Sequence, residues 1–372
     1  MHQMAIINLI LHNLFAFVVI LSIIVFIHEF GHYIIAKICG VKVEQFSIGF
    51  GKELFGWNDK SGTRWKFSLL PFGGYVKMFG DKNPASIVDS TEAEKMTDEE
   101  KKVSFYFQNV YKRIAIVSAG PIANFLLCIV LLTAIFKTQG LTHVLPIIDQ
   151  VQEKSAAFEA GILIGDEILE INDSKIDDFE QIRKIVIENG EKPLEIILRR
   201  DKKIINVELT AIMSVSENIF GDEYKVPLIG IGATQFEYTK LNIGSAFIHA
   251  NIETYNLSVA VVKALGELIT GQRSIKELSG PVKIAEYSGK SMSQGFIVVL
   301  WFMAMISVNL GVANLLPIPA LDGGHLFYYI IEVIRGKPLP EKVQMVGFQF
   351  GFAVLISLML FTTLNDIYNL FK

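Results

Sequence analysis

Four long runs of apolar residues, separated by more polar stretches, dominate the pattern of this chain. They lie at Ala5–Ile27, Ile114–Phe136, Phe296–Pro317 and Val346–Leu364. Each run is long enough to cross a bilayer as a helix, which takes ~20 predominantly apolar residues. The pattern therefore predicts a polytopic α-helical membrane protein with about four transmembrane helices.

The polar stretch after the first run contains an alternating pattern. In "TRWKFSLLPFGGYVKMFG", residues 63–80, Trp65, Phe67 and Leu69 alternate with polar residues. Alternation with a period of two is typical of a half-buried strand. Gly73-Gly74 predicts a turn into a second strand, "YVKMF". The stretch therefore predicts a β-hairpin.

The stretch after the second run combines strand and helix patterns. "LPIIDQV" and "EILEIND" predict strands, and "LEIILRRDKKIINVEL" predicts a hairpin that turns at residues 200–202. "FEQIRKIVIEN" predicts a helix, with Asp177 and Asp178 before it and Gly190 after it. Residues 142–213 are thus expected to form one small α+β module.

The segment "AGILIGDEILEIN", residues 160–172, resembles the PDZ-domain signature. PDZ domains bind extended peptides by adding a strand to the edge of a sheet. The resemblance implies a PDZ-like domain with a peptide or substrate segment as its partner. The alternative is a β-rich module that only separates the membrane helices.

Residues 243–270 are apolar but carry Glu253, Lys263 and Glu267. This mixture favours an amphipathic helix on the outer membrane face, and a fifth span is the alternative. The chain is therefore expected to have four parts. Residues 1–141 hold the first two membrane helices and the hairpin loop, and residues 142–213 form the PDZ-like domain. Residues 214–295 form an amphipathic external segment, and residues 296–372 hold the last two membrane helices.

Composition agrees with a membrane protein that has aqueous modules. The chain has 372 residues, of which 51% are hydrophobic and 19% are charged. The net charge is −4, and no basic stripe interleaved with aromatic residues is present, so nucleic acid is not an expected partner. Cys39 and Cys128 form neither a CxxC pair nor a disulfide framework.

The distribution of Lys and Arg predicts the orientation. Short cytoplasmic loops are richer in these residues than external ones. The loops after the first and third runs are basic and are assigned to the cytoplasm, so the PDZ-like module is external. The basic residues are Lys37, Lys42, Lys52, Lys66, Lys77, Lys112, Arg113, Arg335, Lys337 and Lys342.

Three ionisable residues, His28, Glu29 and His32, stand in "HEFGH" at the end of the first apolar run. On a helix, His28 and His32 lie one turn apart on the same face. Two such imidazoles can bind one zinc ion, and Glu29 can act as a general base on a water molecule. Ionisable groups inside a membrane usually mark function, which favours this interpretation over interfacial histidines.

A catalytic zinc site needs a third protein ligand, and Asp322 in "LDGG" is the best candidate. In the predicted topology both motifs lie at cytoplasmic ends of their spans. Prolines and glycines around Asp322 free the backbone, and such irregular backbone at membrane depth belongs inside the protein. His325 is the rival ligand, and an N-cap role is the alternative for Asp322.

HEFGH together with "NLLPIPALDGG" (314–324) resembles the site-2 protease family of intramembrane zinc metalloproteases, and the PDZ-like module makes the chain similar to its bacterial regulator of sigma E protease group. Four other segments agree: "FSIGFG" (46–51), "PFGGYVKM" (71–78), "AGPIANF" (119–125) and "LSGPVKIA" (278–285). One departure is that the chain has room for a single PDZ-like domain rather than a tandem pair.

The resemblance implies the roles of individual residues. His28, His32 and Asp322 are the expected zinc ligands, and Glu29 is the expected base. Asn314 matches the family asparagine that holds the substrate or stabilises an oxyanion. A helix-to-helix hydrogen bond is the alternative for Asn314.

The resemblance also implies a function and a location. Gly73 and Gly74 lie in the stretch that matches a membrane-associated hairpin, which is thought to position an unwound substrate. The expected protein is a multi-pass enzyme of the bacterial inner membrane, with its active site near the cytoplasm. It would cleave single-span membrane proteins, such as anti-sigma factors or remnant signal peptides, in regulated intramembrane proteolysis. The alternatives are a metal ion transporter and a catalytically inactive PDZ membrane scaffold.

Overall fold

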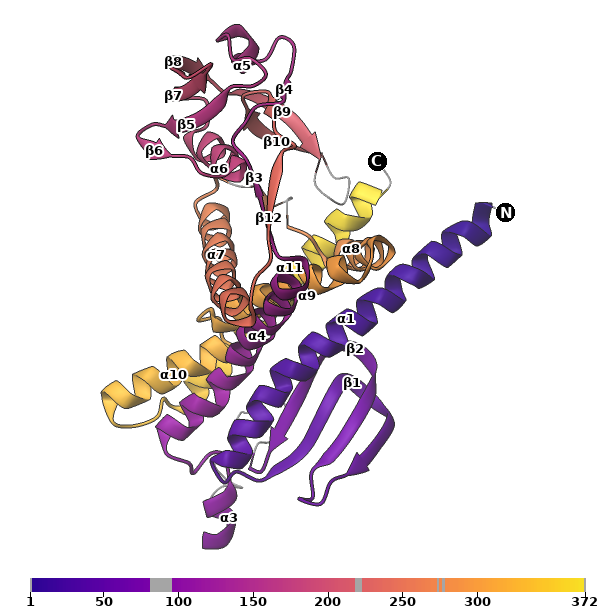
Figure 1. Cartoon of the computed structure of the whole chain (residues 1–372). Helices are drawn as coiled ribbons and strands as arrows, with labels where there is room; N and C mark the ends of the chain where they lie inside the picture. Colours follow the sequence, from indigo (N-terminus) through magenta and orange to yellow (C-terminus); the bar gives the residue numbers. More distant parts are fainter. Residues whose placement is uncertain (1, 81–95, 218–222, 273, 276–277, 371–372) are drawn as a thin grey trace. The chain divides into compact units, whose positions relative to one another are not determined.

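The computed structural model describes residues 2–80, 96–217, 223–272, 274–275 and 278–370. Two compact units make up the chain (Figure 1). The first, the helical unit, comprises Met1–Ile135 and Gly244–Lys372, and the second, the β-rich unit, comprises Phe136–Ile243.

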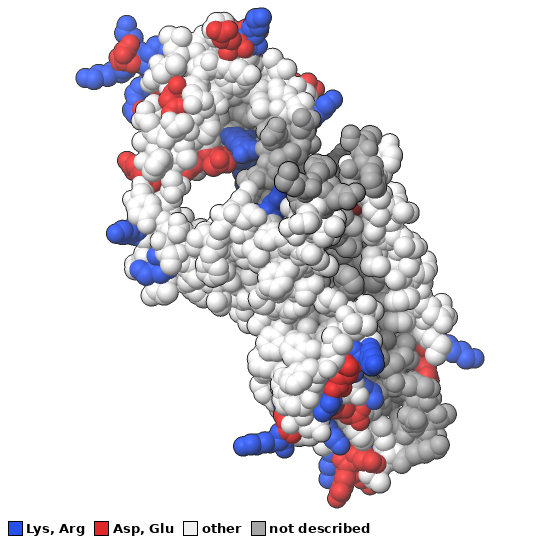
Figure 2. Space-filling model, turned by 90° about the vertical axis from the view of Figure 1, so that its right-hand side faces the viewer, with Lys and Arg blue, Asp and Glu red and all other residues white. Residues whose placement is uncertain are grey.

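Long apolar helices form the frame of the helical unit. They are α1 (His2–Ile38), α4 (Val110–Gln139), α9 (Phe296–Leu315) and α11 (Glu341–Leu370). The parts long and apolar enough to cross a membrane are Ile7–Ile38, Val110–Gln139, Phe296–Leu315 and Glu341–Asn369, which agrees with the four predicted runs. On the face of this unit shown in Figure 2, charged side chains gather toward its lower end and leave a broad white zone.

Helix α1 continues beyond the predicted end at Ile27, so that HEFGH lies within it. It ends where Gly40 adopts a φ of 83°. The Gly40 N–H then bonds to the carbonyl of Lys37 and the Val41 N–H to that of Ala36, a Schellman arrangement. The histidines are therefore on regular helix rather than at its frayed end.

Four further helices belong to the described part of the helical unit. Helix α7 covers the segment for which an amphipathic helix was predicted, and whether it lies on the membrane or crosses it stays a prediction. Helix α8 is preceded by its N-cap residue Gly280, whose N–H group donates to Asp366 of α11 at 3.0 Å. The four helices are α3 (Asp98–Val103), α7 (Ile243–Ile269), α8 (Pro281–Gln294) and α10 (Asp322–Arg335).

A two-stranded antiparallel sheet, β1 (Val43–Asn58) with β2 (Arg64–Met78), follows α1. Residues 45–48 of β1 pair with residues 64–67 of β2 and, in reverse order, with residues 74–77. The chain thus changes direction between residues 67 and 74 of β2, and Gly74 is already paired with Ile48. The sequence did not predict β1, which is the partner of both parts.

The turn between β1 and β2 lies at residues 59–63 and depends on Asp59. One carboxylate oxygen of Asp59 accepts the N–H groups of Ser61 and Thr63. The other accepts the Tyr33 hydroxyl of α1 and the Trp65 indole N–H, each at 3.0 Å. Burial alone would raise the pKa of Asp59, but these hydrogen bonds hold it below its ordinary value. The turn is thereby attached to α1.

The β-rich unit has a four-stranded sheet in the order β6-β5-β7-β8 and three two-stranded pairs, β3 with β12, β4 with β11, and β9 with β10. Its core is apolar and includes Ile148, Ile168 and Leu194. The strands are β3 (Leu141–Val144), β4 (Gln150–Val151), β5 (Glu167–Ile171), β6 (Ser174–Lys175), β7 (Pro193–Arg200), β8 (Lys203–Thr210), β9 (Ile212–Glu217), β10 (Glu223–Leu228), β11 (Ile231–Gly232) and β12 (Phe236–Thr239).

Two helices pack in this unit, α5 (Ala156–Glu159) and α6 (Phe179–Asn189). The α6 prediction is confirmed: Asp178 caps its first turn, and Gly190 follows it with a φ of 65°. The hairpin β7–β8 turns at Asp201 and Lys202, also as predicted, with both residues at positive φ. The strand expected for "LPIIDQV" is wrong except at its last two residues, which form β4.

Asp166 is a fully buried charged residue of the β-rich unit. Its side chain is 1% exposed and accepts two hydrogen bonds from Arg200, at 2.7 and 2.6 Å, and one from the Leu163 N–H at 2.8 Å. Burial opposes ionisation, but these donors lower the pKa of Asp166 below its ordinary value. The ionised carboxylate therefore stabilises the fold above the unfolded-state pKa, and this contribution is lost as pH falls below it.

Replacing Asp166 with Asn should lower the free energy of opening of β5 and β7 at neutral pH by about 1–3 kcal/mol, because the charged partner of Arg200 is removed. Hydrogen exchange in the full chain, corrected for intrinsic rates, measures this. The wild-type protein should lose the same contribution as pH falls below ~4, and the variant should not. Exposed Asp173→Asn is the control. Equal protection of wild type and Asp166→Asn at neutral pH would contradict the assignment.

Candidate metal centre

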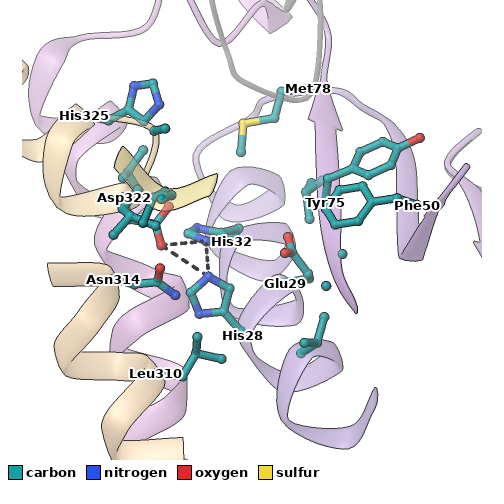
Figure 3. A pocket seen from close by; sticks show the side chains of 18 of the residues that line it. His28, Glu29, His32, Phe50, Tyr75, Met78, Leu310, Asn314, Asp322 and His325 are labelled. Carbon is teal, nitrogen blue, oxygen red and sulfur yellow. Dashed lines mark hydrogen bonds and ion pairs between the residues drawn. The ribbon is translucent and has the colours of Figure 1, made fainter. Parts of the chain in front are cut away.

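Helix α1 presents His28 and His32 on one face, one turn apart, inside the helical unit. Both side chains are buried, at 8% and 7% exposure. Their Nε2 atoms are 3.3 Å apart, and the two rings meet edge to face. Figure 3 shows both nitrogens directed at the same point.

Asp322 reaches that point from the first residue of α10. Its Oδ2 lies 3.2 Å from Nε2 of His28 and 3.5 Å from Nε2 of His32. Gly323 makes this approach possible, because a Cβ atom there would collide with the backbone of Leu315 and Leu316. The loop between α9 and α10 can therefore fold tightly and aim the carboxylate inward.

The three ligand atoms fit a zinc ion. Tetrahedral zinc with bonds of 2.0–2.1 Å to nitrogen and oxygen requires ligand atoms roughly 3.3 Å apart. The three separations of 3.2, 3.3 and 3.5 Å meet this requirement. Oδ2 of Asp322 is also buried and accepts no hydrogen bond from the described residues. Two imidazole nitrogens and a carboxylate oxygen are a donor set typical of catalytic zinc.

Helix α4 supports both imidazoles from behind the ligand atoms. Nδ1 of His32 lies 2.8 Å from the carbonyl oxygen of Ile116, and Nδ1 of His28 lies 3.1 Å from the side-chain amide of Asn124. Gly120 stands between them on the same face of α4. A Cβ atom on Gly120 would lie 2.9 Å from Cε1 of His28 and still closer to His32. Only glycine leaves room for the two rings.

A second glycine brings the two helices together. A Cβ atom on Gly31, the glycine of HEFGH, would lie 2.8 Å from Cβ of Ala123 and would collide with the carbonyl of Ala119. Small residues permit this kind of close helix packing in membranes. The glycine in HEFGH therefore sets the α1–α4 distance, which the spacing of the ligands alone did not indicate.

A cavity of about 550 Å³ opens beside the ligand atoms, and the other predicted site residues line it. Glu29 is 8% exposed and lies next to His28 on α1. Asn314 of α9 lines the opposite wall, and Gly73 and Gly74 of β2 line the rim. A Cβ atom on Gly74 would lie 2.9 Å from Cγ of Glu29, so β2 passes directly over that carboxylate.

His325, the rival ligand, also lines this cavity, but its ring points away from the three ligand atoms in Figure 3. Among the described residues, the group able to hold a metal ion consists of His28, His32 and Asp322. Three residues after Asp322, α10 has already turned the His325 side chain to another face. The structure thus favours the carboxylate over the imidazole.

An ion pair joins α4, which supports the two histidines, to α10, which carries Asp322. Arg113, near the start of α4, contacts Glu332 of α10 at 2.5 Å, with side-chain exposures of 10% and 15%. The Arg113 guanidinium also lies 4.8 Å from the centre of the Tyr329 ring. This contact holds α10, which begins at Asp322, against α4.

Sequence reasoning missed the contribution of α4. The motif "AGPIANF" was recognised as a match, but no chemistry was assigned to Gly120 or Asn124, and the carbonyl of Ile116 carries no sequence signal at all. The four-residue spacing of 116, 120 and 124 places them on one helix face. For Gly120 and Asn124, that spacing is the signal that could have identified them.

Comparison with known proteins agrees with this geometry. The profile of Peptidase family M50 matches residues 16–358. A protein of Rickettsia conorii named "Putative zinc metalloprotease" is 39% identical over 97% of this chain and 99% of its own length. A protein of Agrobacterium fabrum with the same description is 38% identical over 95% of both chains, and metalloprotease MmpA of Caulobacter vibrioides is 33% identical over 95% of both.

The chain therefore belongs to peptidase family M50. Its zinc dependence and its metalloprotease class follow from that membership, and its four apolar helices agree with a membrane protein.

Asp322→Ala should reduce zinc affinity by more than 100-fold, because losing an outer-shell partner of a ligand already costs about 10- to 100-fold. His325→Asn should leave zinc affinity unchanged. Both are measured by competition with a chromophoric chelator on the purified full-length protein. Loss of zinc in His325→Asn, with Asp322→Ala unaffected, would show that the ligand assignment is wrong.

Proposed function

We propose that this M50 metalloprotease cleaves single-span membrane proteins in or near their transmembrane segment. The observation that carries the proposal is the location of the centre. His28, Glu29 and His32 lie within the candidate span Ile7–Ile38, and Asp322 reaches them from the start of α10, just after the candidate span Phe296–Leu315. A protease that acted only on soluble substrates would have no need for catalytic groups at that depth.

Bound zinc supplies Lewis acidity and makes water a nucleophile near neutral pH. Glu29 holds the proton taken from that water and delivers it to the leaving amine. Its position in the cavity, beside His28 and beneath Gly74, supports this role. Asn314, across the cavity, can donate its amide to the substrate carbonyl as charge develops on the oxygen.

The substrate segment would bind as a strand on β2. Residues 74–78 pair with β1 on one side, and no described strand pairs with their other edge. Gly73, Gly74 and Tyr75 line the cavity beside this edge. An intact helix hides its peptide bonds, so a substrate span must unwind before cleavage, and strand pairing would hold the unwound segment. Exposed Phe55, Trp57 and Leu69 support contact of the hairpin with lipid.

The β-rich unit would bind an extended peptide in the manner of a PDZ domain. A cavity of about 640 Å³ lies between α6 and the segment 227–232, with Ile182 and Val186 on its helical wall. Its apolar lining beside a short strand, β11, supports recognition of a substrate segment outside the membrane.

The distribution of charge supports a location. The basic loops favour a metal centre near the cytoplasmic side of a bacterial inner membrane, with the β-rich unit outside. In that setting the enzyme would act in regulated intramembrane proteolysis, on anti-sigma factors or remnant signal peptides already shortened by another cut. Membership of a protease family, with Glu29 in place, supports this over transport and over an inactive scaffold.

Glu29→Gln should retain zinc and lose proteolysis by at least about 100-fold, because the amide cannot take the proton. The test uses the full-length protein in detergent, a single-span model substrate and a parallel zinc assay. Glu99→Gln, on exposed α3, is the matched control. Cleavage by Glu29→Gln at the wild-type rate would contradict the mechanism.

A further inference from the structure

Asn124 lies at the centre of the α4 face that supports the imidazoles. It is fully buried, and its backbone carbonyl accepts the Ser307 hydroxyl of α9 at 2.8 Å. Its side-chain nitrogen lies 3.1 Å from Nδ1 of His28, while its side-chain oxygen is buried with no hydrogen-bond partner among the described residues. A buried amide with one unused end is costly unless a second arrangement uses it.

The two histidines differ in what faces their Nδ1 atoms. His32 faces a backbone carbonyl, which can only accept, so its Nδ1 carries the hydrogen and its Nε2 is free to bind metal. His28 faces a side-chain amide, which can either donate or accept. The tautomer of His28 is therefore set by how that amide is turned.

With its nitrogen toward Nδ1, as in this structure, the Asn124 amide can only donate, which requires the His28 hydrogen on Nε2, 3.2 Å from Oδ2 of Asp322. A ligand Nε2 must instead offer its lone pair, which moves the hydrogen to Nδ1. A half-turn of the amide then places the Asn124 oxygen where the Nδ1–H group can donate to it.

We propose that Asn124 is a positioning residue for the metal centre. Its amide oxygen accepts the Nδ1–H of His28 when zinc is bound and holds the ring with Nε2 toward the ion. The proposal rests on the zinc centre described above but not on the substrate.

Three variants separate this role from simple packing. Asn124→Leu has nearly the same volume but can accept nothing, and zinc affinity should fall about 10- to 100-fold. Asn124→Asp keeps an acceptor, and its affinity should return to within a few-fold of wild type. Ser118→Ala, on the exposed side of α4, is the control and should have no effect.

The experiment is a competition titration of the metal-free full-length protein in detergent with zinc and a chromophoric chelator. The thermal unfolding midpoint of each metal-free variant checks folding. Cobalt(II) substitution provides a second reading, because the visible spectrum should shift in Asn124→Leu and remain near wild type in Asn124→Asp.

Two results would overturn the proposal. One is wild-type zinc affinity in Asn124→Leu. The other is equal loss of affinity in Asn124→Leu and Asn124→Asp with unchanged unfolding midpoints, since acceptor capacity would then be irrelevant. If Asn124→Leu does not fold, histidine ¹⁵N NMR of the zinc-loaded wild type decides: a protonated, hydrogen-bonded Nδ1 on both ligand histidines supports the proposal, and a metal-bound Nδ1 on His28 contradicts it.

Discussion

The meeting of His28, His32 and Asp322 within 3.5 Å of one another is the interaction on which the rest of this structure depends. Polar groups converging among apolar helices are costly, and a shared cation offsets that cost. The convergence needs helices that approach far more closely than ordinary side chains allow. Gly31 and Gly120 provide this between α1 and α4, and the tight loop before α10 provides it for the third ligand.

Other contacts hold the elements around these three ligands in position. The Arg113–Glu332 pair joins α4 to α10, and the Tyr33–Asp59 hydrogen bond joins α1 to the turn of the sheet. Because β2 passes over Glu29 through Gly74, the same anchoring holds the strand edge and the expected base side by side. Metal centre, base and strand edge are therefore parts of one packed assembly within the helical unit.

The sequence predicted the features that depend on local pattern. The four spans follow from apolar length and helix α6 from its caps. Spacing predicts His28 and His32 as candidate ligands, and the expected topology adds Asp322. It did not predict β1, whose pairing with two parts of β2 is a long-range contact. Helix α3 was missed although Thr97 and Glu100 form a capping box, a local signal that a highly charged stretch obscured. The support from Ile116 depends on a backbone carbonyl, which no residue identity reveals.

X-ray absorption at the zinc edge of the loaded full-length protein tests the convergence of the three ligands most directly. The account predicts a first shell of nitrogen and oxygen at about 2.0–2.1 Å, with outer-shell scattering from two imidazoles. Asp322→Ala should remove one oxygen and leave both imidazole signals in whatever metal remains bound. Three imidazoles in the wild type, or a sulfur ligand, would contradict the account, because His28, His32 and Asp322 would then not be the three protein ligands.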